Sequence, residues 1–179
     1  MKKAASRLLA VLIVIGLAGC QNRQNGQIIT SDSRSKKEQN DPFIQGNRRL
    51  LELENEEIEL YLKRYGWETN STGTGLRIQI TSRTNGKNPV EGSRVTLKYN
   101  TRLLNGETLY SSEESGEKVF VVDKSEEITG LHEAVKLMRN GEKARLIIPS
   151  HLAYGIAGDG NKIKGPSTLV MRIEITDVQ

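Results

Sequence analysis

The side chains that most often carry out catalysis or bind metals are few in this chain of 179 residues. It has two histidines, His132 and His151, and one cysteine, Cys20, and all three lie apart in the sequence. The usual zinc sites combine several cysteines and histidines, so a single cysteine excludes them and also excludes an internal disulfide. Because little around the histidines indicates a site, we expect both to be structural or surface residues. We therefore expect no metal, no other cofactor and no hydrolase-like catalytic group.

The first 19 residues are typical of an export signal. Basic residues precede an apolar run at residues 8–17, and small residues lead up to Cys20. A membrane-spanning helix is the alternative, but the run is far shorter than the ~20 residues that cross a bilayer. The residues before Cys20 resemble the lipobox of bacterial lipoproteins. We therefore expect residues 1–19 to be removed and Cys20 to carry the lipid that anchors the protein to a membrane.

The net charge excludes one class of function. The whole chain has a formal net charge of +4, but Lys2, Lys3 and Arg7 would leave with the signal, so 23 of the 26 basic residues remain against 22 acidic ones. The remaining basic residues are mixed with acidic ones, and no stripe of basic and aromatic residues appears. Nucleic acid is therefore not an expected partner.

Two segments are expected to separate the anchor from the folded domain. Residues 20–46 are mostly polar and can bury too little apolar surface to order themselves, which predicts a flexible tether. Within residues 47–75, apolar side chains recur every three or four positions up to Tyr65, which predicts an amphipathic helix ended by Gly66, with Trp67 packing back. A linker rich in Ser, Thr and Gly would follow. We expect the apolar stripe of this helix to dock on its own chain, and a dimer contact is the alternative.

The pattern changes in residues 76–179, where apolar and polar residues alternate as in strands buried on one face. The alternation is clearest at residues 76–81, 95–100, 144–148 and 169–175. Only the segment from Leu131 to Met138 has helical spacing, and Thr129 before it could cap the helix. One short helix that covers an antiparallel sheet makes an α+β domain.

Three sequence blocks in this domain carry a family resemblance. In chain order they are Val95–Tyr99 with Asn105-Gly106-Glu107, Ile128–Leu131 with Leu137–Ala144, and Pro149–Gly155 with Thr168-Leu169-Val170. Together they resemble the FKBP-type peptidyl-prolyl isomerases over residues 76–178. The resemblance implies an FKBP-like antiparallel sheet wrapped around one short helix, and activity on X-Pro bonds without a cofactor.

The resemblance also implies an apolar site. Rotation about an X-Pro bond has a barrier of ~18–20 kcal/mol, and an enzyme lowers it by binding the twisted bond better than either planar form. The Tyr154 hydroxyl would donate to a substrate carbonyl, the backbone N–H of Ile128 would be a second donor, and Tyr99 would complete the catalytic set. The rest of the pocket would comprise Leu109, Tyr110, Phe120, Leu131 at its floor, Ile163 and Met171. By spacing alone, all of these would be assigned to the core.

Several positions depart from the family pattern. Leu109-Tyr110 stands at the usual Phe-Asp pair, so a phenol replaces the pocket carboxylate. Glu127 precedes Ile128 where an apolar residue is usual, and residues 155–166 lack the frequent histidine and paired prolines. We therefore expect a more polar, more mobile rim and weak binding of macrolide inhibitors.

The leading hypothesis is a membrane-anchored prolyl isomerase that helps exported envelope proteins with X-Pro bonds to fold. The signal, the tether, the helix and residues 150–155 together resemble the FKBP-type lipoproteins associated with gliding motility in Bacteroidota. That resemblance implies gliding-motility clients and the periplasmic face of the outer membrane.

One alternative is a catalytically weak binding module, favoured by Tyr110 and Glu127. Another is a structural protein whose helix at residues 47–65 contacts a second copy or other machinery, and the oligomeric state stays open.

Overall fold

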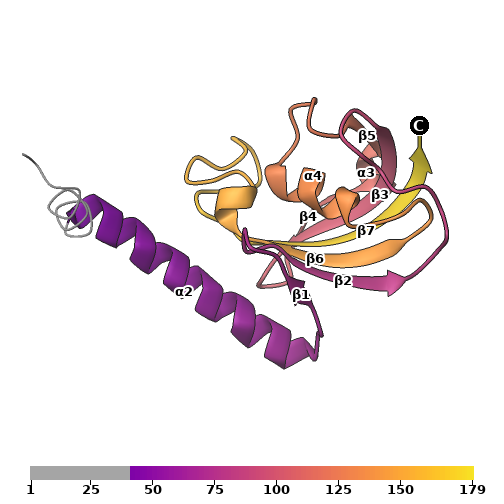
Figure 1. Cartoon of the computed structure of the whole chain (residues 1–179). Helices are drawn as coiled ribbons and strands as arrows, with labels where there is room; N and C mark the ends of the chain where they lie inside the picture. The colour runs from indigo at the N-terminus through magenta and orange to yellow at the C-terminus, as the bar shows by residue number, and fades with distance from the viewer. Residues whose placement is uncertain (1–40) are drawn as a thin grey trace, which may run out of the picture. The chain divides into compact units, whose positions relative to one another are not determined.

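The structure is a computed structural model that describes residues 41–179 (Figure 1). The predicted signal peptide (residues 1–19), the predicted lipidation site Cys20 and the tether up to residue 40 lie outside the described residues. The elements, in chain order, are α2 (Pro42–Tyr65), β1 (Asn70–Ser71), β2 (Arg77–Ser82), β3 (Arg94–Leu103), β4 (Thr108–Ser111), α3 (Ser112–Ser115), β5 (Lys118–Val121), α4 (Thr129–Lys136), β6 (Lys143–Ile148), a 3₁₀ turn at Ser150–Leu152 and β7 (Leu169–Val178).

Helix α2 begins at Pro42 rather than at Asn47, so the last residues assigned to the tether are helical. The Asp41 carboxylate accepts a hydrogen bond of 2.8 Å from the backbone N–H of Phe43, and a proline suits the first helical position. The end of the helix is as predicted. Gly66 is left-handed, with φ 59°, and its N–H bonds the carbonyl oxygen of Leu62.

The strands form one antiparallel sheet in the order β1-β2-β6-β7-β3-β4, and β5 also pairs with β3. The four predicted strands appear as β2, β3, β6 and β7. The predicted linker after α2 is wrong in part, because Asn70 and Ser71 form β1 and pair with β2. Strand β3 runs beside β7 along its whole length (Figure 1). The inward-facing residues of these two strands form much of the core.

Helix α4 lies against one face of the sheet and confirms the α+β class (Figure 1). Leu131, Val135 and Met138 are fully buried in the core that it shares with the strands. The predicted Thr129 cap is wrong: Thr129 is the first helical residue, and Ile128 occupies the cap position without a side-chain hydrogen bond.

Helix α2 packs on the other face of the sheet. Neighbouring residues in a strand point to opposite faces, so Ile147 faces away from the core that holds its neighbours in β6. Ile58 and Leu62 of α2 bury themselves against Ile147 and Val170. This contact agrees with the expected docking of the helix on its own chain.

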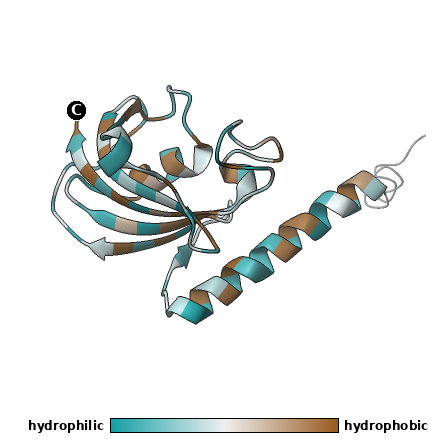
Figure 2. Cartoon of the chain, turned by 180° about the vertical axis from the view of Figure 1, so that it is seen from behind, coloured by the Kyte–Doolittle hydropathy of each residue, from teal (hydrophilic) through white to brown (hydrophobic). Residues whose placement is uncertain are grey.

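Apolar residues continue along α2 toward its N-terminus, as the hydropathy colouring shows (Figure 2). There they are exposed, and Phe43, Leu50 and Leu51 are among them. No helix within residues 41–179 has the length and hydropathy that a membrane span requires.

Candidate active site

A cavity of about 390 Å³ opens where β3 and β4 meet the residues before α4 and the loop between β6 and β7. Its lining residues are Tyr99, Thr101, Tyr110, Lys118, Glu127, Ile128, Tyr154, Asp159, Asn161, Ile163, Leu169 and Met171. Hollows of about 520 and 630 Å³ lie elsewhere on the described chain, so size alone does not identify a site. The smaller cavity is the candidate because three tyrosines and an apolar wall converge in it.

The structure brings six of the nine predicted pocket residues together. Tyr99, Tyr110, Ile128, Tyr154, Ile163 and Met171 all line this cavity. Leu109, Phe120 and Leu131 belong to the buried core and are not among the lining residues. The structure therefore does not place Leu131 at the floor of this cavity.

Tyr154 follows the 3₁₀ turn at Ser150–Leu152 and precedes Gly155, which is left-handed with φ 60°. Burial, together with the nearby negative charges of Glu127 and Asp159, raises the pKa of Tyr154 to about 12. The hydroxyl therefore keeps its proton at neutral pH and can donate a hydrogen bond into the cavity.

The backbone N–H of Ile128 is not free, contrary to the prediction that it would serve a substrate carbonyl. It donates to Glu127 Oε1 at 2.9 Å. The other carboxylate oxygen of Glu127 pairs with Lys118, whose ammonium lies 5.4 Å from the centre of the Tyr99 ring. An N–H in the first positions of a helix lacks a partner inside the helix, and here a neighbouring carboxylate supplies one.

The sequence indicated that Tyr110 would leave the cavity without a carboxylate. The structure shows that a carboxylate is present. The Tyr110 hydroxyl donates to Asp159 Oδ2, while Oδ1 accepts from the backbone N–H groups of Asn161 and Ile163, at 2.8 Å each. Burial alone would raise the pKa of Asp159, but these hydrogen bonds outweigh it and hold the pKa below its usual value. The loop thus supplies a carboxylate that the sequence prediction missed.

The same contacts tie the loop to β4. Lys162 donates from Nζ to the carbonyl oxygen of Leu109 at 2.7 Å, and its ammonium lies 5.1 Å from the centre of the Tyr110 ring. The lining residues that the prediction omitted, besides Asp159, are Thr101, Lys118, Glu127, Asn161 and Leu169. The alternation along β3 and β7 could have indicated Thr101 and Leu169, because both share a face with predicted pocket residues.

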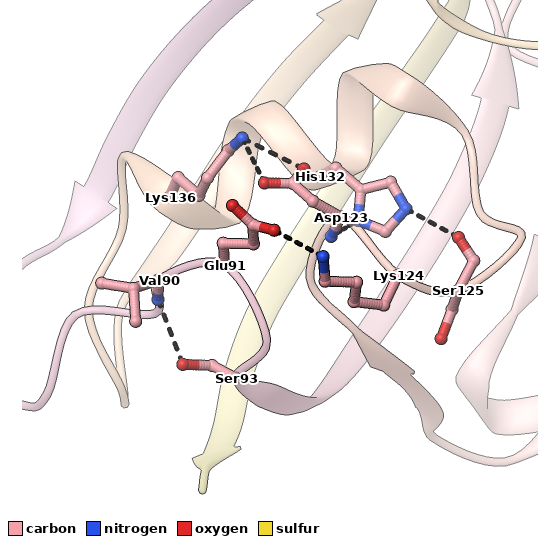
Figure 3. A network of polar contacts seen from close by, with 8 residues as sticks. All are labelled: Val90, Glu91, Ser93, Asp123, Lys124, Ser125, His132 and Lys136. Atoms are coloured by element: carbon pink, nitrogen blue, oxygen red, sulfur yellow. Dashed lines mark hydrogen bonds and ion pairs between the residues drawn. The ribbon is translucent and has the colours of Figure 1, made fainter.

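The two histidines have structural contacts. His132 is buried, its Nδ1 accepts from the backbone N–H of Asp123 at 3.0 Å, and its Nε2 donates to the carbonyl oxygen of Ser125 at 3.1 Å (Figure 3). Asp123 also pairs with Lys136 of α4. These contacts hold the segment that leads to Glu127.

His151 is exposed and donates from Nε2 to the carbonyl oxygen of Thr74 at 2.9 Å. Within residues 41–179 no group of acidic, histidine or cysteine side chains is arranged to hold a metal ion.

A family model for the FKBP-type peptidyl-prolyl cis-trans isomerases matches residues 85–176. The chain is 36% identical over 108 residues to a probable FKBP-type peptidyl-prolyl cis-trans isomerase FkpA of Neisseria meningitidis, covering 60% of this chain and 39% of that protein. It is 37% identical over 110 residues to the FKBP-type 22 kDa peptidyl-prolyl cis-trans isomerase of Escherichia coli, covering 61% and 52%. The chain thus spans about half the length of these curated relatives.

Among solved structures, the crystal structure of FkpA from Escherichia coli is similar, with a TM-score of 0.62 and 29% sequence identity. That similarity covers 83% of this chain and 68% of the other. It therefore extends beyond the 85–176 segment that the family model matches.

Proposed function

Because the chain belongs to the FKBP-type peptidyl-prolyl cis-trans isomerase family, we propose that it catalyses the cis–trans isomerisation of X-Pro bonds in unfolded exported proteins. The observation that carries this proposal is the protonated Tyr154 hydroxyl at the edge of a cavity whose wall includes Ile128, Ile163 and Met171. An apolar wall removes water from the imide, and a hydroxyl donor binds the carbonyl as the bond twists.

The test is the isomerisation rate of a panel of short X-Pro peptides with the full chain in mild detergent. We expect acceleration that Tyr154→Ala reduces by at least roughly tenfold, within the range that positioned polar groups contribute to catalysis. Tyr65→Ala is the matched control, because Tyr65 is an exposed tyrosine on α2, outside the cavity. A folded wild-type protein that accelerates none of the peptides would reject the proposal.

One contact favours a second candidate function, a binding module with little turnover. The Glu127 carboxylate already occupies the N–H of Ile128, so the cavity offers a substrate fewer free donors than expected. Such a module would hold unfolded chains without twisting their X-Pro bonds. It predicts that suppression of client aggregation survives Tyr154→Ala, whereas an isomerase-dependent folding effect does not.

The setting in which the activity operates is also part of the proposal. The apolar run before Cys20 supports a lipid anchor, and the resemblance to gliding-motility lipoproteins supports the periplasmic face of the outer membrane and envelope clients. Membrane fractionation of the wild type against Cys20→Ser tests the anchor, because only the unlipidated variant should enter the soluble fraction. Deletion of the protein in a gliding host tests the client class. Unchanged gliding would reject the proposal that its clients are gliding-motility proteins.

A further inference from the structure

One carboxylate interrupts the apolar face by which α2 docks on the sheet. Glu54, Ile58 and Leu62 follow one another at intervals of four and so share one side of the helix. Ile58 and Leu62 are buried in the contact, and Glu54 beside them is half-buried. A charge in such a place is costly unless hydrogen bonds replace its lost water. Apolar docking alone gives no reason for a glutamate here.

Three donors of the domain meet this carboxylate. The backbone N–H of Ser150 donates to Oε1 at 2.6 Å, and the Ser150 hydroxyl donates to Oε2 at 2.9 Å. The hydroxyl of Thr168 donates to Oε1 at 2.5 Å. Ser150 and Thr168 are both buried and stand at the two ends of the segment that carries Tyr154, Asp159 and Ile163. Glu54 therefore joins α2 to both ends of this segment, which carries Tyr154.

Ser150 in turn holds the residues on either side of Tyr154. Its carbonyl oxygen accepts from the backbone N–H of Ala153 at 3.0 Å and of Gly155 at 2.8 Å. All the backbone polar groups and the hydroxyl of Ser150 are thus bonded, on one side to Glu54 and on the other to the Tyr154 turn. A rotation of Ser150 would move both neighbours of Tyr154 together.

We propose that Glu54 is a positioning residue for Tyr154, which makes α2 a working part of the isomerase site. Glu54 acts through Ser150 and does not touch the substrate cavity. The inference rests on the proposed function, since Tyr154 is taken as the donor. As a consequence, the domain from residue 76 onward does not by itself contain every residue that aligns its active site, because Glu54 lies outside it.

The test compares two variants of the full chain. Glu54→Ala removes the acceptor of Ser150, whereas Arg77→Ala removes a different contact of α2, the hydrogen bonds from Arg77 to Asn55 Oδ1 at 2.7 Å and Glu59 Oε1 at 3.0 Å. We expect Glu54→Ala to lower kcat/KM roughly tenfold, mainly through kcat, as a small misplacement of a positioned group does. Arg77→Ala should keep the wild-type value. Equal losses in the two variants would show that only docking of the helix matters.

A second readout does not depend on turnover. The amides of Ala153 and Gly155 should exchange hydrogen faster in Glu54→Ala than in the wild type, and the amides of β7 should not change. Glu54→Gln keeps one acceptor oxygen and should recover part of both effects. Unchanged exchange at Ala153 and Gly155 would overturn the proposal even if activity fell. A wild-type protein without activity would reject the proposed function, and the exchange result would still decide the role of Glu54.

A third variant covers the case in which Glu54→Ala does not fold. Ser150→Ala combined with Thr168→Val removes both hydroxyl donors and leaves α2 unchanged. It should reproduce most of the loss in kcat, and adding Glu54→Gln to it should cost little more, because all three residues act through one cluster. Additive losses would contradict the proposal.

Discussion

The carboxylate of Glu127 accepts a hydrogen bond of 2.9 Å from the backbone N–H of Ile128, the residue that follows it. Its other oxygen pairs with Lys118, and the Glu127 side chain is only 10% exposed. A carbonyl group that approaches Ile128 from the cavity must displace this carboxylate before it can use the N–H. The contact thus competes with binding at the place where the family resemblance implies a donor.

Replacing Glu127 by alanine should therefore free the N–H and raise kcat/KM for X-Pro peptides. One hydrogen bond of about 1 kcal/mol corresponds to roughly a fivefold gain. Peptide isomerisation rates would measure it, and Glu126→Ala is the control because it removes the same charge from the exposed neighbouring residue. A decrease confined to Glu127→Ala would show instead that the carboxylate assists the reaction.

Tyr110→Phe should loosen the loop that carries Asp159. It removes the hydroxyl that donates to this carboxylate and leaves the ring under Lys162. We expect a loss of about 1 kcal/mol in the free energy of unfolding at neutral pH, the usual net value of one such bond. Denaturant unfolding would measure it, with Tyr65→Phe as the control on an exposed tyrosine.

The effect of Tyr110→Phe should depend on pH with a definite sign. The pKa of Asp159 is lower in the folded protein than its usual value of 3.8, so its contribution is present above that value and is lost as the pH falls through the folded pKa. The stability gap between wild type and Tyr110→Phe should therefore narrow in acid, below the usual carboxyl pKa. A gap that stays constant down to full protonation would mean that the hydroxyl acts elsewhere.

Gly130→Ala should destabilise the domain, chiefly through its contact with Ile148. A Cβ at Gly130 would lie 2.4 Å from Cγ2 of Ile148, which is fully buried and cannot move aside. Such overpacking costs ~1–3 kcal/mol. Gly46→Ala is the same substitution inside α2, where a Cβ would meet nothing within 4 Å, and it should stabilise by ~0.5–1 kcal/mol. Unfolding free energies of the two variants should move in opposite directions, and a neutral Gly130→Ala would show that α4 can shift away from β6.

Much of the fold could be predicted because its signals are local. The alternation at residues 95–100 and 169–175 follows from a sheet with one buried face, and both strands appeared. Gly66 marked the end of α2 because a left-handed residue there is inexpensive only for glycine. The start of α2 was misplaced because residues 42–46 are not clearly amphipathic, and only the Asp41 cap fixes it.

The site was harder to predict because its decisive contacts join distant segments. Asp159 lies among small polar residues and gives no sign of its bond to Tyr110, 49 residues earlier. Glu54 is one of several glutamates on α2. Its partner Ser150 lies 96 residues later in the sequence, and only docking of the helix brings the two within hydrogen-bond distance. Leu109 was assigned to the pocket by resemblance, but strand alternation puts it in the core and its neighbour Tyr110 in the cavity.

The raised pKa of Tyr154 leads to a last prediction, on stability in alkali. An unfolded tyrosine ionises near its usual pKa of 10.0, whereas folded Tyr154 keeps its proton up to about 12. The stabilisation is fully present below pH 10 and is lost as the pH rises through the folded pKa, so unfolding becomes easier over this range. Tyr154→Phe cannot ionise and should lose less stability between pH 10 and 12. Denaturant unfolding of both proteins across this range would measure the difference, which cancels the contributions of the other tyrosines. Parallel curves would mean that Tyr154 ionises near pH 10 in the folded protein, and its hydroxyl would then be more open to water than the cavity indicates.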